Sequence, residues 1–400
     1  MLVYLLDWLS LLGRWLHFVV GIAWIGASLY FVWLDNHLQP PQDAEDDARG
    51  VGGELWSVHG GGFYHAQKYR GAPPQLPETL HWFKWEAYST WWSGMFLLVL
   101  VYWYGADIYL IDPTVLALTH PQAVAAAAAV LLIAWFGYDL LCRSFLARND
   151  TLLTFALFFF ITALAWSVCQ LFSGRGAYIH FGAALGTIMV GNVFRVIIPG
   201  QRAMVAAAGA GSVPDPSHAL QGKQRSVHNT YLTLPVLFVM ISHHYAMTYA
   251  SNYNWLVLIA LATAGALIRV YFVARHRGAA SPWPLVIAIL LLAGVAAALA
   301  PTATQQTSAS VSDATIETIV AQRCATCHAQ QPTHSAYSSA PAGLLLENLE
   351  QIRQASARVH EQTVVSRAMP IANLTQITEA ERAQIDAWYQ QLQRASGATP

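Results

Sequence analysis

Residues 151–172 read TLLTFALFFFITALAWSVCQLF, a run without a single charged side chain. A helix needs about 20 apolar residues to cross the roughly 30 Å hydrocarbon core of a bilayer, so this run predicts a membrane span. Seven similar stretches lie near 11–34, 88–105, 123–142, 178–199, 229–250, 254–274 and 283–300. The sequence therefore predicts an all-α fold whose main part is a polytopic membrane helical bundle of about eight spans.

The composition agrees with a chain that lies mostly in lipid. Of 400 residues, 55% are hydrophobic and 11% are charged, and the mean hydropathy is +0.39. The charges gather in segments 35–86 and 311–400, which we interpret as the two water-facing parts. A net charge of −1 provides no basic surface and excludes nucleic-acid binding. Four cysteines are too few for a disulfide scaffold.

We divide the chain into a membrane domain, residues 1–300, and a small C-terminal helical domain, residues 311–400. The membrane domain has a large cytoplasmic segment at 35–87. The polar stretch PTATQQTSAS, residues 301–310, predicts a linker between the two domains. In the C-terminal domain, Thr378 followed three residues later by Glu381 predicts a capping box at the start of a helix.

The distribution of Lys and Arg predicts the orientation in the membrane, because cytoplasmic loops carry an excess of both. Basic residues lie in the odd-numbered connections, for example Arg49, Lys68, Arg143 and Arg202, whereas the second and sixth connections have none. We therefore expect the odd connections to be cytoplasmic and both termini to be periplasmic, in a bacterial inner membrane.

Residues 324–328 read CATCH, the C-x-x-C-H sequence that attaches heme c covalently. One turn of chain presents the thiols of Cys324 and Cys327 to the two heme vinyl groups, and His328 then lies under the iron. The alternative is a redox or zinc C-x-x-C, but no second cysteine pair completes a zinc site. The motif predicts that residues 311–400 are a class I-type cytochrome c domain. Heme attachment takes place outside the cytoplasm, in agreement with the predicted orientation.

The sixth iron ligand should lie downstream of the motif, where Met369 is the one methionine. A thioether ligand raises the heme potential, as in cytochromes c. The alternatives are that Met369 is a core residue or that His360 is the ligand instead.

Ionisable residues within predicted spans indicate function. His17, His180, His243 and His244 lie in the outer halves of their spans, and small residues follow His17 and His180 at helical spacing. We predict a heme b bound by two of His17, His180 and His244, with His17 and His244 as iron ligands. The alternative is hydrogen bonding between helices.

Residues 53–94 are too rich in aromatic and titratable side chains for an ordinary solvated loop. We predict an anion-binding cleft here, whose acid–base and charged residues are Glu54, His59, Lys68, Glu86 and Arg195. Asn192, His228, Asn229 and Tyr231 lie on the same side. The alternative is an amphipathic segment that lies on the membrane surface.

The chain resembles a known family, the integral-membrane urate oxidases fused to a cytochrome c. The similar stretches are RWLHFVVGIAWIGASLYFVWLDN (14–36), ELWSVHGGGFYHAQKY (54–69), LHWFKWEAYSTWWSG (80–94), NVFRVIIPGQ (192–201), HNTYLTLPVLFVMISHHY (228–245), CATCH and AMP (368–370). Asn is usual in the family at the position of His243, which favours His244 as the functional member of the pair.

The resemblance implies that the protein oxidises urate to 5-hydroxyisourate and passes the electrons to cytochrome c instead of forming hydrogen peroxide. A respiratory-chain acceptor, such as a terminal oxidase or a soluble cytochrome c, then takes them. Urate is a planar anion, so Arg195 or Lys68 suits its charge, and His59 or Glu86 suits proton removal. The main alternative is a quinol-oxidising cytochrome b/c relay. A plain membrane anchor for a c-type carrier leaves residues 53–94 unexplained.

Overall fold

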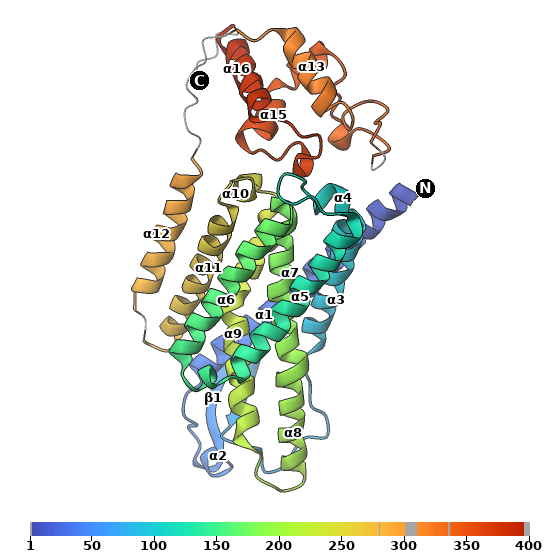
Figure 1. Cartoon of the computed structure of the whole chain (residues 1–400). Helices are drawn as coiled ribbons and strands as arrows, with labels where there is room; N and C mark the ends of the chain where they lie inside the picture. The colour runs from blue at the N-terminus through green and yellow to red at the C-terminus, as the bar shows by residue number, and fades with distance from the viewer. Residues whose placement is uncertain (1, 280, 301–309, 335–336, 396–400) are drawn as a thin grey trace.

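The computed structural model describes residues 2–279, 281–300, 310–334 and 337–395. Long helices form a bundle, and a smaller helical domain lies at one end of it (Figure 1). The bundle helices are α1 (Leu2–His37), α3 (Trp85–Leu97), α5 (His120–Arg143), α6 (Asp150–Leu171), α7 (Gly174–Asn192), α8 (Ile198–Gly209), α9 (Pro216–Ser242), α11 (Asn254–His276) and α12 (Trp283–Ala298). Two π-helical stretches extend them: η1 (Leu98–Trp103) continues α3, and η3 (Val193–Ile197) joins α7 to α8.

Each of the eight predicted spans falls on helix, but the number of spans is not confirmed. Within the described ranges, five helices are long and apolar enough to cross a membrane: Tyr4–His37, His120–Arg143, Asp150–Leu171, Gly174–Gly209 and Asn254–His276. The other three fall short for different reasons. Helix α3 has only 13 residues before η1 begins, the first half of α9 is polar, and α12 has only 16 residues.

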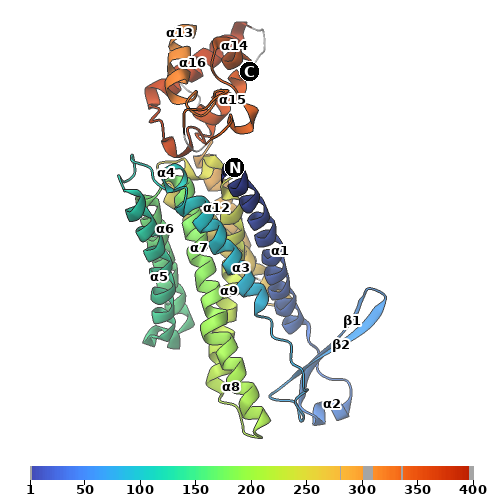
Figure 2. The ribbon, with the colours of Figure 1, turned by 90° about the vertical axis from the view of Figure 1, so that its right-hand side faces the viewer.

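The start of α1 and the C-terminal domain lie at the same end of the bundle (Figure 1). We call this the upper end. The opposite, lower end carries α8 and a β-hairpin, which projects away from the helices (Figure 2). The rod Gly174–Gly209 has 36 residues, and at 1.5 Å per residue it is about 54 Å long. This exceeds the thickness of the hydrocarbon core, so part of the rod reaches beyond that core.

The prediction of a helical fold holds for most of the described chain, but the β-hairpin is an exception to the all-α class. Strands β1 (Val51–His59) and β2 (Gly62–Tyr69) pair antiparallel, with His59 opposite Gly62. The turn residues Gly60 and Gly61 have φ of 56° and 80°, values that favour glycine and that a tight two-residue hairpin turn requires. The short helix α2 (Ala44–Ala48) precedes the hairpin. Two of the three glycines in HGGG therefore form a turn between strands.

The core of the bundle lies around α5, α6 and α7. Its largest fully buried side chains include Tyr138, Phe172, Tyr178 and Phe181. By contrast, α1 leaves a row of large apolar side chains exposed, among them Phe18 at 62%. Contact of such an apolar face with water is unfavourable, whereas its contact with lipid is not, so the face is compatible with a position against lipid.

The C-terminal domain has a separate core, which includes Ile316, Ile352 and Trp388. Its helices are α13 (Asp313–Arg323), α14 (Leu349–Gln354), α15 (Ser356–His360) and α16 (Glu379–Ala395). The predicted capping box is confirmed: Thr378 N donates to Glu381 Oε2 at 2.6 Å, and Glu381 N donates to Thr378 Oγ1 at 3.2 Å. Most of the predicted linker, residues 301–309, lies outside the described residues.

Candidate functional site

The C-x-x-C-H segment forms a tight turn directly after α13. Cys324 caps the helix, and the backbone N–H groups of Cys327 and His328 both donate to Cys324 O, at 3.1 and 3.0 Å. The His328 ring donates from Nδ1 to Leu344 O at 3.1 Å. This bond leaves Nε2 as the basic nitrogen, and a second hydrogen bond of this kind is what fixes metal-binding histidines in proteins. The three residues therefore fit covalent heme c.

Burial sets the protonation of these groups. It raises the pKa of the Cys324 thiol to about 12, with a smaller contribution from Cys327, and it also raises the pKa of Cys327. Burial lowers the pKa of His328, although its bond to Leu344 opposes the shift. The imidazole is therefore neutral at physiological pH, as an iron ligand requires.

Met369 lies in the loop between η5 (Glu361–Val365) and η6 (Ile371–Asn373). Two backbone bonds hold this loop, because Met369 N donates to Gln362 O at 2.9 Å and Arg382 Nη1 donates to Met369 O at 3.1 Å. His360, the alternative ligand, is engaged elsewhere: its Nε2 lies 2.7 Å from Asp386 Oδ1, and its ring stacks on Tyr389 at 4.3 Å. These contacts favour Met369 over His360.

At the lower end, Glu54 and Lys68 each have a partner on or near the hairpin. Glu54 Oε2 lies 2.8 Å from His65 Nε2, and Lys68 Nζ donates to Asp35 Oδ1 at 2.8 Å. A hydrogen bond from the Gln42 backbone holds the pKa of Glu54 below its ordinary value. Lys68 pairs with Gly53, the residue before Glu54. Because successive residues of a strand point to opposite faces of the sheet, the side chains of Glu54 and Lys68 lie on opposite faces of the hairpin.

The other three predicted lower-end residues lie apart from this pair. His59 is exposed at the hairpin tip, about 17 Å from Glu54 at 3.4 Å per strand residue. Glu86 lies in the first turn of α3, and its Oε2 is buried without a partner. Arg195 is exposed on η3, beside the Phe194 ring. In the described part of the chain, no hydrogen bond or ion pair joins any two of the five.

A buried polar network at the lower ends of α5, α7 and α9 was not predicted as such. Arg225, 3% exposed, donates from Nη2 to Asp139 Oδ1 at 2.7 Å and lies over the Tyr138 ring. Asn192 donates to Tyr138 Oη and to Asn229 Oδ1, both at 2.9 Å. The signal in the sequence was Asp139, the one charged residue within 123–142. Asn192 and Asn229, predicted to line a cleft, instead bond to each other and so join helices.

The predicted heme b ligands differ in their freedom to bind iron. His17 uses Nδ1 toward Thr90 O at 3.1 Å and Ser93 Oγ at 3.0 Å, which joins α1 to α3. His180 is fully buried and uses both ring nitrogens: Nδ1 donates to Gly176 O at 2.8 Å, and Nε2 accepts from Trp103 Nε1 at 3.2 Å. His180 therefore does not fit an iron ligand, and its contacts are those of the alternative, hydrogen bonding between segments.

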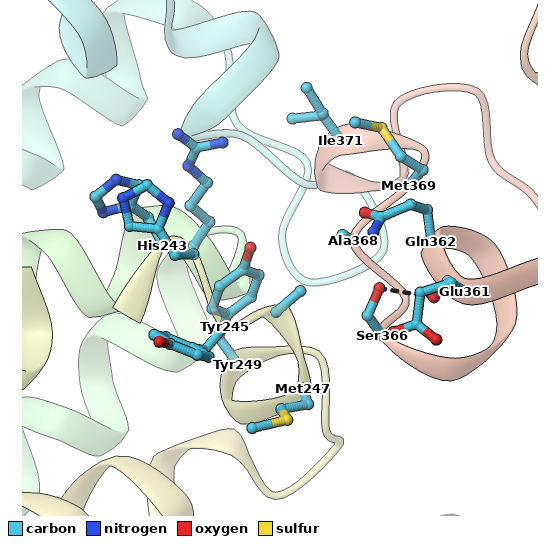
Figure 3. A pocket seen from close by; sticks show the side chains of 13 residues that line it. His243, Tyr245, Met247, Tyr249, Glu361, Gln362, Ser366, Ala368, Met369 and Ile371 are labelled. Atoms are coloured by element: carbon cyan, nitrogen blue, oxygen red, sulfur yellow. Dashed lines mark hydrogen bonds between the residues drawn. The ribbon is translucent and has the colours of Figure 1, made fainter. Parts of the chain in front are cut away.

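His243 and His244 lie at the upper end, directly after α9, with ring centroids 3.9 Å apart. They line a cavity of about 340 Å³ between the bundle and the C-terminal domain. Figure 3 shows the two walls facing each other across it. From the bundle, the wall consists of Arg175, His243, His244, Tyr245, Ala246, Met247 and Tyr249; from the C-terminal domain, it consists of Glu361, Gln362, Ser366, Ala368, Met369 and Ile371. This pocket could not be predicted from the sequence, because its walls come from segments more than 100 residues apart.

Residues 3–300 match the family described as urate oxidase N-terminal. The chain belongs to this family. The matched region covers the bundle and ends where the predicted linker begins, so the C-terminal domain lies outside it. Comparisons with curated proteins and with solved structures give no match. Membership of the urate oxidase N-terminal family indicates an oxidoreductase with urate-related chemistry, and the apolar helices are compatible with insertion in a membrane.

Proposed function

We propose that the protein is a membrane-bound urate oxidase that passes electrons to its own C-terminal cytochrome c domain and on to a respiratory-chain acceptor, without forming hydrogen peroxide. The observation that carries this proposal is the Cys324–His328 turn, with His328 Nε2 left free by the bond to Leu344 O. This turn lies in the same chain as a urate oxidase N-terminal family domain.

The reaction balances without molecular oxygen. Urate and water give 5-hydroxyisourate, two protons and two electrons: a new C–O bond forms at the purine C5, and the oxygen comes from water. Heme c, when bound, supplies a one-electron acceptor, so the two electrons of each urate leave singly.

The chain's own residues hold the acceptor in place in this proposal. Cys324 and Cys327 bind it covalently, the Leu344 carbonyl orients His328, and Arg382 holds the loop that carries Met369. His180 has no free ring nitrogen, and a heme b held by His17 and His244 stays a prediction from the sequence. The lower-end cleft of Glu54, His59, Lys68, Glu86 and Arg195 stays a prediction from the sequence.

We also propose that the protein resides in a bacterial inner membrane with its upper end in the periplasm. Two arguments support this orientation. Heme c is attached outside the cytoplasm, and the C-terminal domain that carries the motif lies at the upper end (Figure 1). The Lys and Arg of the odd connections indicate the same orientation.

The test is anaerobic reduction of the c-heme absorption band in membranes that contain the protein. Urate should reduce the band within seconds, and membranes with Cys327→Ser, which largely lose covalent heme, should show no such change. A parallel sample receives a quinol. Rapid reduction by quinol with no response to urate would replace the proposal with a quinol-oxidising relay.

A further inference from the structure

The pocket at the upper end has a composition that suits an organic anion. We propose that this pocket, and not the lower-end segment, binds the purine anion, so that oxidation takes place between the bundle and the Met369 loop. This inference rests on the proposed function and assigns its substrate site.

Arg175 supplies the positive charge. Its Nε donates to Tyr102 Oη at 3.3 Å, and its guanidinium lies over the Tyr109 ring, 5.1 Å from the centroid. In the part of the chain that the structure describes, no carboxylate forms an ion pair with Arg175. Its two terminal nitrogens therefore remain for a ligand, and the planar guanidinium forms paired hydrogen bonds with planar anions.

Aromatic rings and imidazoles supply the rest of the bundle wall. Tyr245 and His244 are exposed, and Tyr249 packs edge-on against Tyr178 at 5.9 Å. Gly174 allows the close approach of this loop to α7, because a Cβ there would collide with Tyr249 O. Flat rings suit a planar heterocycle, and an imidazole is a side chain that can take up a proton during oxidation.

The opposite wall belongs to the proposed cytochrome c domain. Gln362 and Met369 line it, and the backbone bond between them keeps the heme-ligand loop at the pocket (Figure 3). A side-chain amide such as that of Gln362 offers both a donor and an acceptor, which match the alternating N–H and C=O groups at the edge of a purine.

Tyr337, in the C-terminal domain, is influenced by groups of both domains. Burial raises the pKa of Tyr337, the neighbouring Tyr109 and Cys327 raise it further, and Arg175 lowers it. The shift indicates that Tyr109, Arg175 and Cys327 all lie in the neighbourhood of Tyr337. The contact of η6 with α4 (Ala106–Tyr109) holds the two domains together at the same place.

Size and distance both favour this location. A volume of about 340 Å³ lies at the low end of small-molecule pockets and suits a bicyclic anion better than a porphyrin. A substrate at the lower end would be separated from the heme by about 30 Å of hydrocarbon and would need a relay. At the upper end, the electrons pass directly from the substrate to the adjoining domain.

The experiment measures binding of radiolabelled urate to the purified holoprotein after reduction with dithionite. Reduced protein has no electron acceptor, so bound urate is not consumed. Arg175→Gln should weaken binding about tenfold or more, because a charge-assisted pair of hydrogen bonds is lost. Arg175→Lys, which keeps the charge without the planar fork, should bind with intermediate affinity. The matched control is Arg277→Gln, an arginine at the lower end of α11 that donates to Asn36, and its affinity should equal that of the wild type.

The covalent heme content of each variant, from the pyridine hemochrome, shows that the C-terminal domain is intact, and an unchanged Tm in detergent shows that the bundle has folded. His244→Ala provides a second variant at an exposed position and should lower kcat more than it raises KM. Unchanged binding by folded Arg175→Gln would overturn the upper-end site, and so would weakened binding by Arg195→Gln alone.

A second measurement needs no variant. Sealed vesicles of both orientations receive urate, and the impermeant oxidant ferricyanide identifies the face that carries the heme. We expect urate to reduce the heme when added to that same face. Reduction only from the opposite face would contradict the inference while leaving urate oxidation intact. No reduction from either face, also after permeabilisation, would instead contradict the proposed function.

Discussion

Met369 and His360 show how the surroundings of a side chain separate two ligand candidates that the sequence leaves open. His360 is bound to Asp386 and stacked on Tyr389, whereas the bonds that hold Met369 involve only its backbone. The C-x-x-C-H motif was readable from the sequence because its five residues are contiguous. The state of His180 was not, because Trp103 reaches its Nε2 from a segment 77 residues away.

Met369→Ala should keep the covalent heme and lower its reduction potential, because the thioether is lost. Axial ligands shift heme potentials over about 0.8 V, so we expect a change of the order of 0.1 V or more in a potentiometric titration. The control is His360→Ala, which should leave the potential near that of the wild type. The opposite pattern would assign the sixth position to His360.

Asp139→Asn should destabilise the bundle by about 3 kcal/mol, because the buried Arg225 guanidinium loses its charged partner. Thermal unfolding in detergent measures the effect as a lower Tm. Asp107→Asn is the matched control: Asp107 pairs with His120 in an exposed position, where an ion pair contributes at most about 1 kcal/mol. Equal losses in both variants would show that the network does not stabilise the bundle.

At the scale of elements, local signals predicted helix ends better than they predicted the hairpin. The capping box of α16 was readable because Thr378 and Glu381 form it within one turn. The strands β1 and β2 were not predicted, because their aromatic and titratable side chains were interpreted as the lining of an anion-binding cleft. The Gly60–Gly61 turn between runs rich in Val, Phe and Tyr was the signal for a hairpin.

Thr378→Ala should destabilise the C-terminal domain by about 1 kcal/mol, because an N-cap hydroxyl is lost. Denaturant unfolding of the full-length protein, followed through the c-heme absorption, measures this change. Thr318→Ala is the control: its hydroxyl bonds to Ala314 O on the exposed face of α13, and its loss should cost little.

The same cap makes the domain sensitive to acid. Burial raises the pKa of Glu381, but hydrogen bonds from Thr378 and Arg323 outweigh it and hold the pKa below its ordinary value. A carboxylate of this kind contributes stability above its unfolded pKa, and the contribution is lost as the pH falls through the folded pKa. Below about pH 4, the wild type should therefore approach the stability of Glu381→Gln, and a constant difference at all pH values would contradict this role.

At the scale of the whole molecule, the up-and-down order of successive helices was easier to predict than the number of helices that span a membrane. The start of α1 and the C-terminal domain lie at the same end of the bundle, as an even number of spans predicts (Figure 1). The number of spans was less secure, because α3, α9 and α12 are short or partly polar and depend on neighbours. The upper-end pocket was not predictable, since its walls come from segments of the two domains that are more than 100 residues apart in sequence.

Reporter fusions test the topology at two points. A fusion after residue 310 should be active only outside the cytoplasm, and one within residues 43–50 only inside. Agreement at one point and failure at the other would mean that the number of spans is wrong by one. Reversal at both would invert the orientation and place the heme motif on the side where heme c is not attached.

The central claim is that both electrons of urate enter the heme of the C-terminal domain. An anaerobic titration of the oxidised, purified protein with urate tests it most directly, with the c-heme band and the remaining urate recorded together. We predict that two hemes are reduced for each urate consumed and that 5-hydroxyisourate appears in equal amount to the urate lost. Consumption of urate without reduction of the heme, accompanied in air by one hydrogen peroxide per urate, would contradict the account.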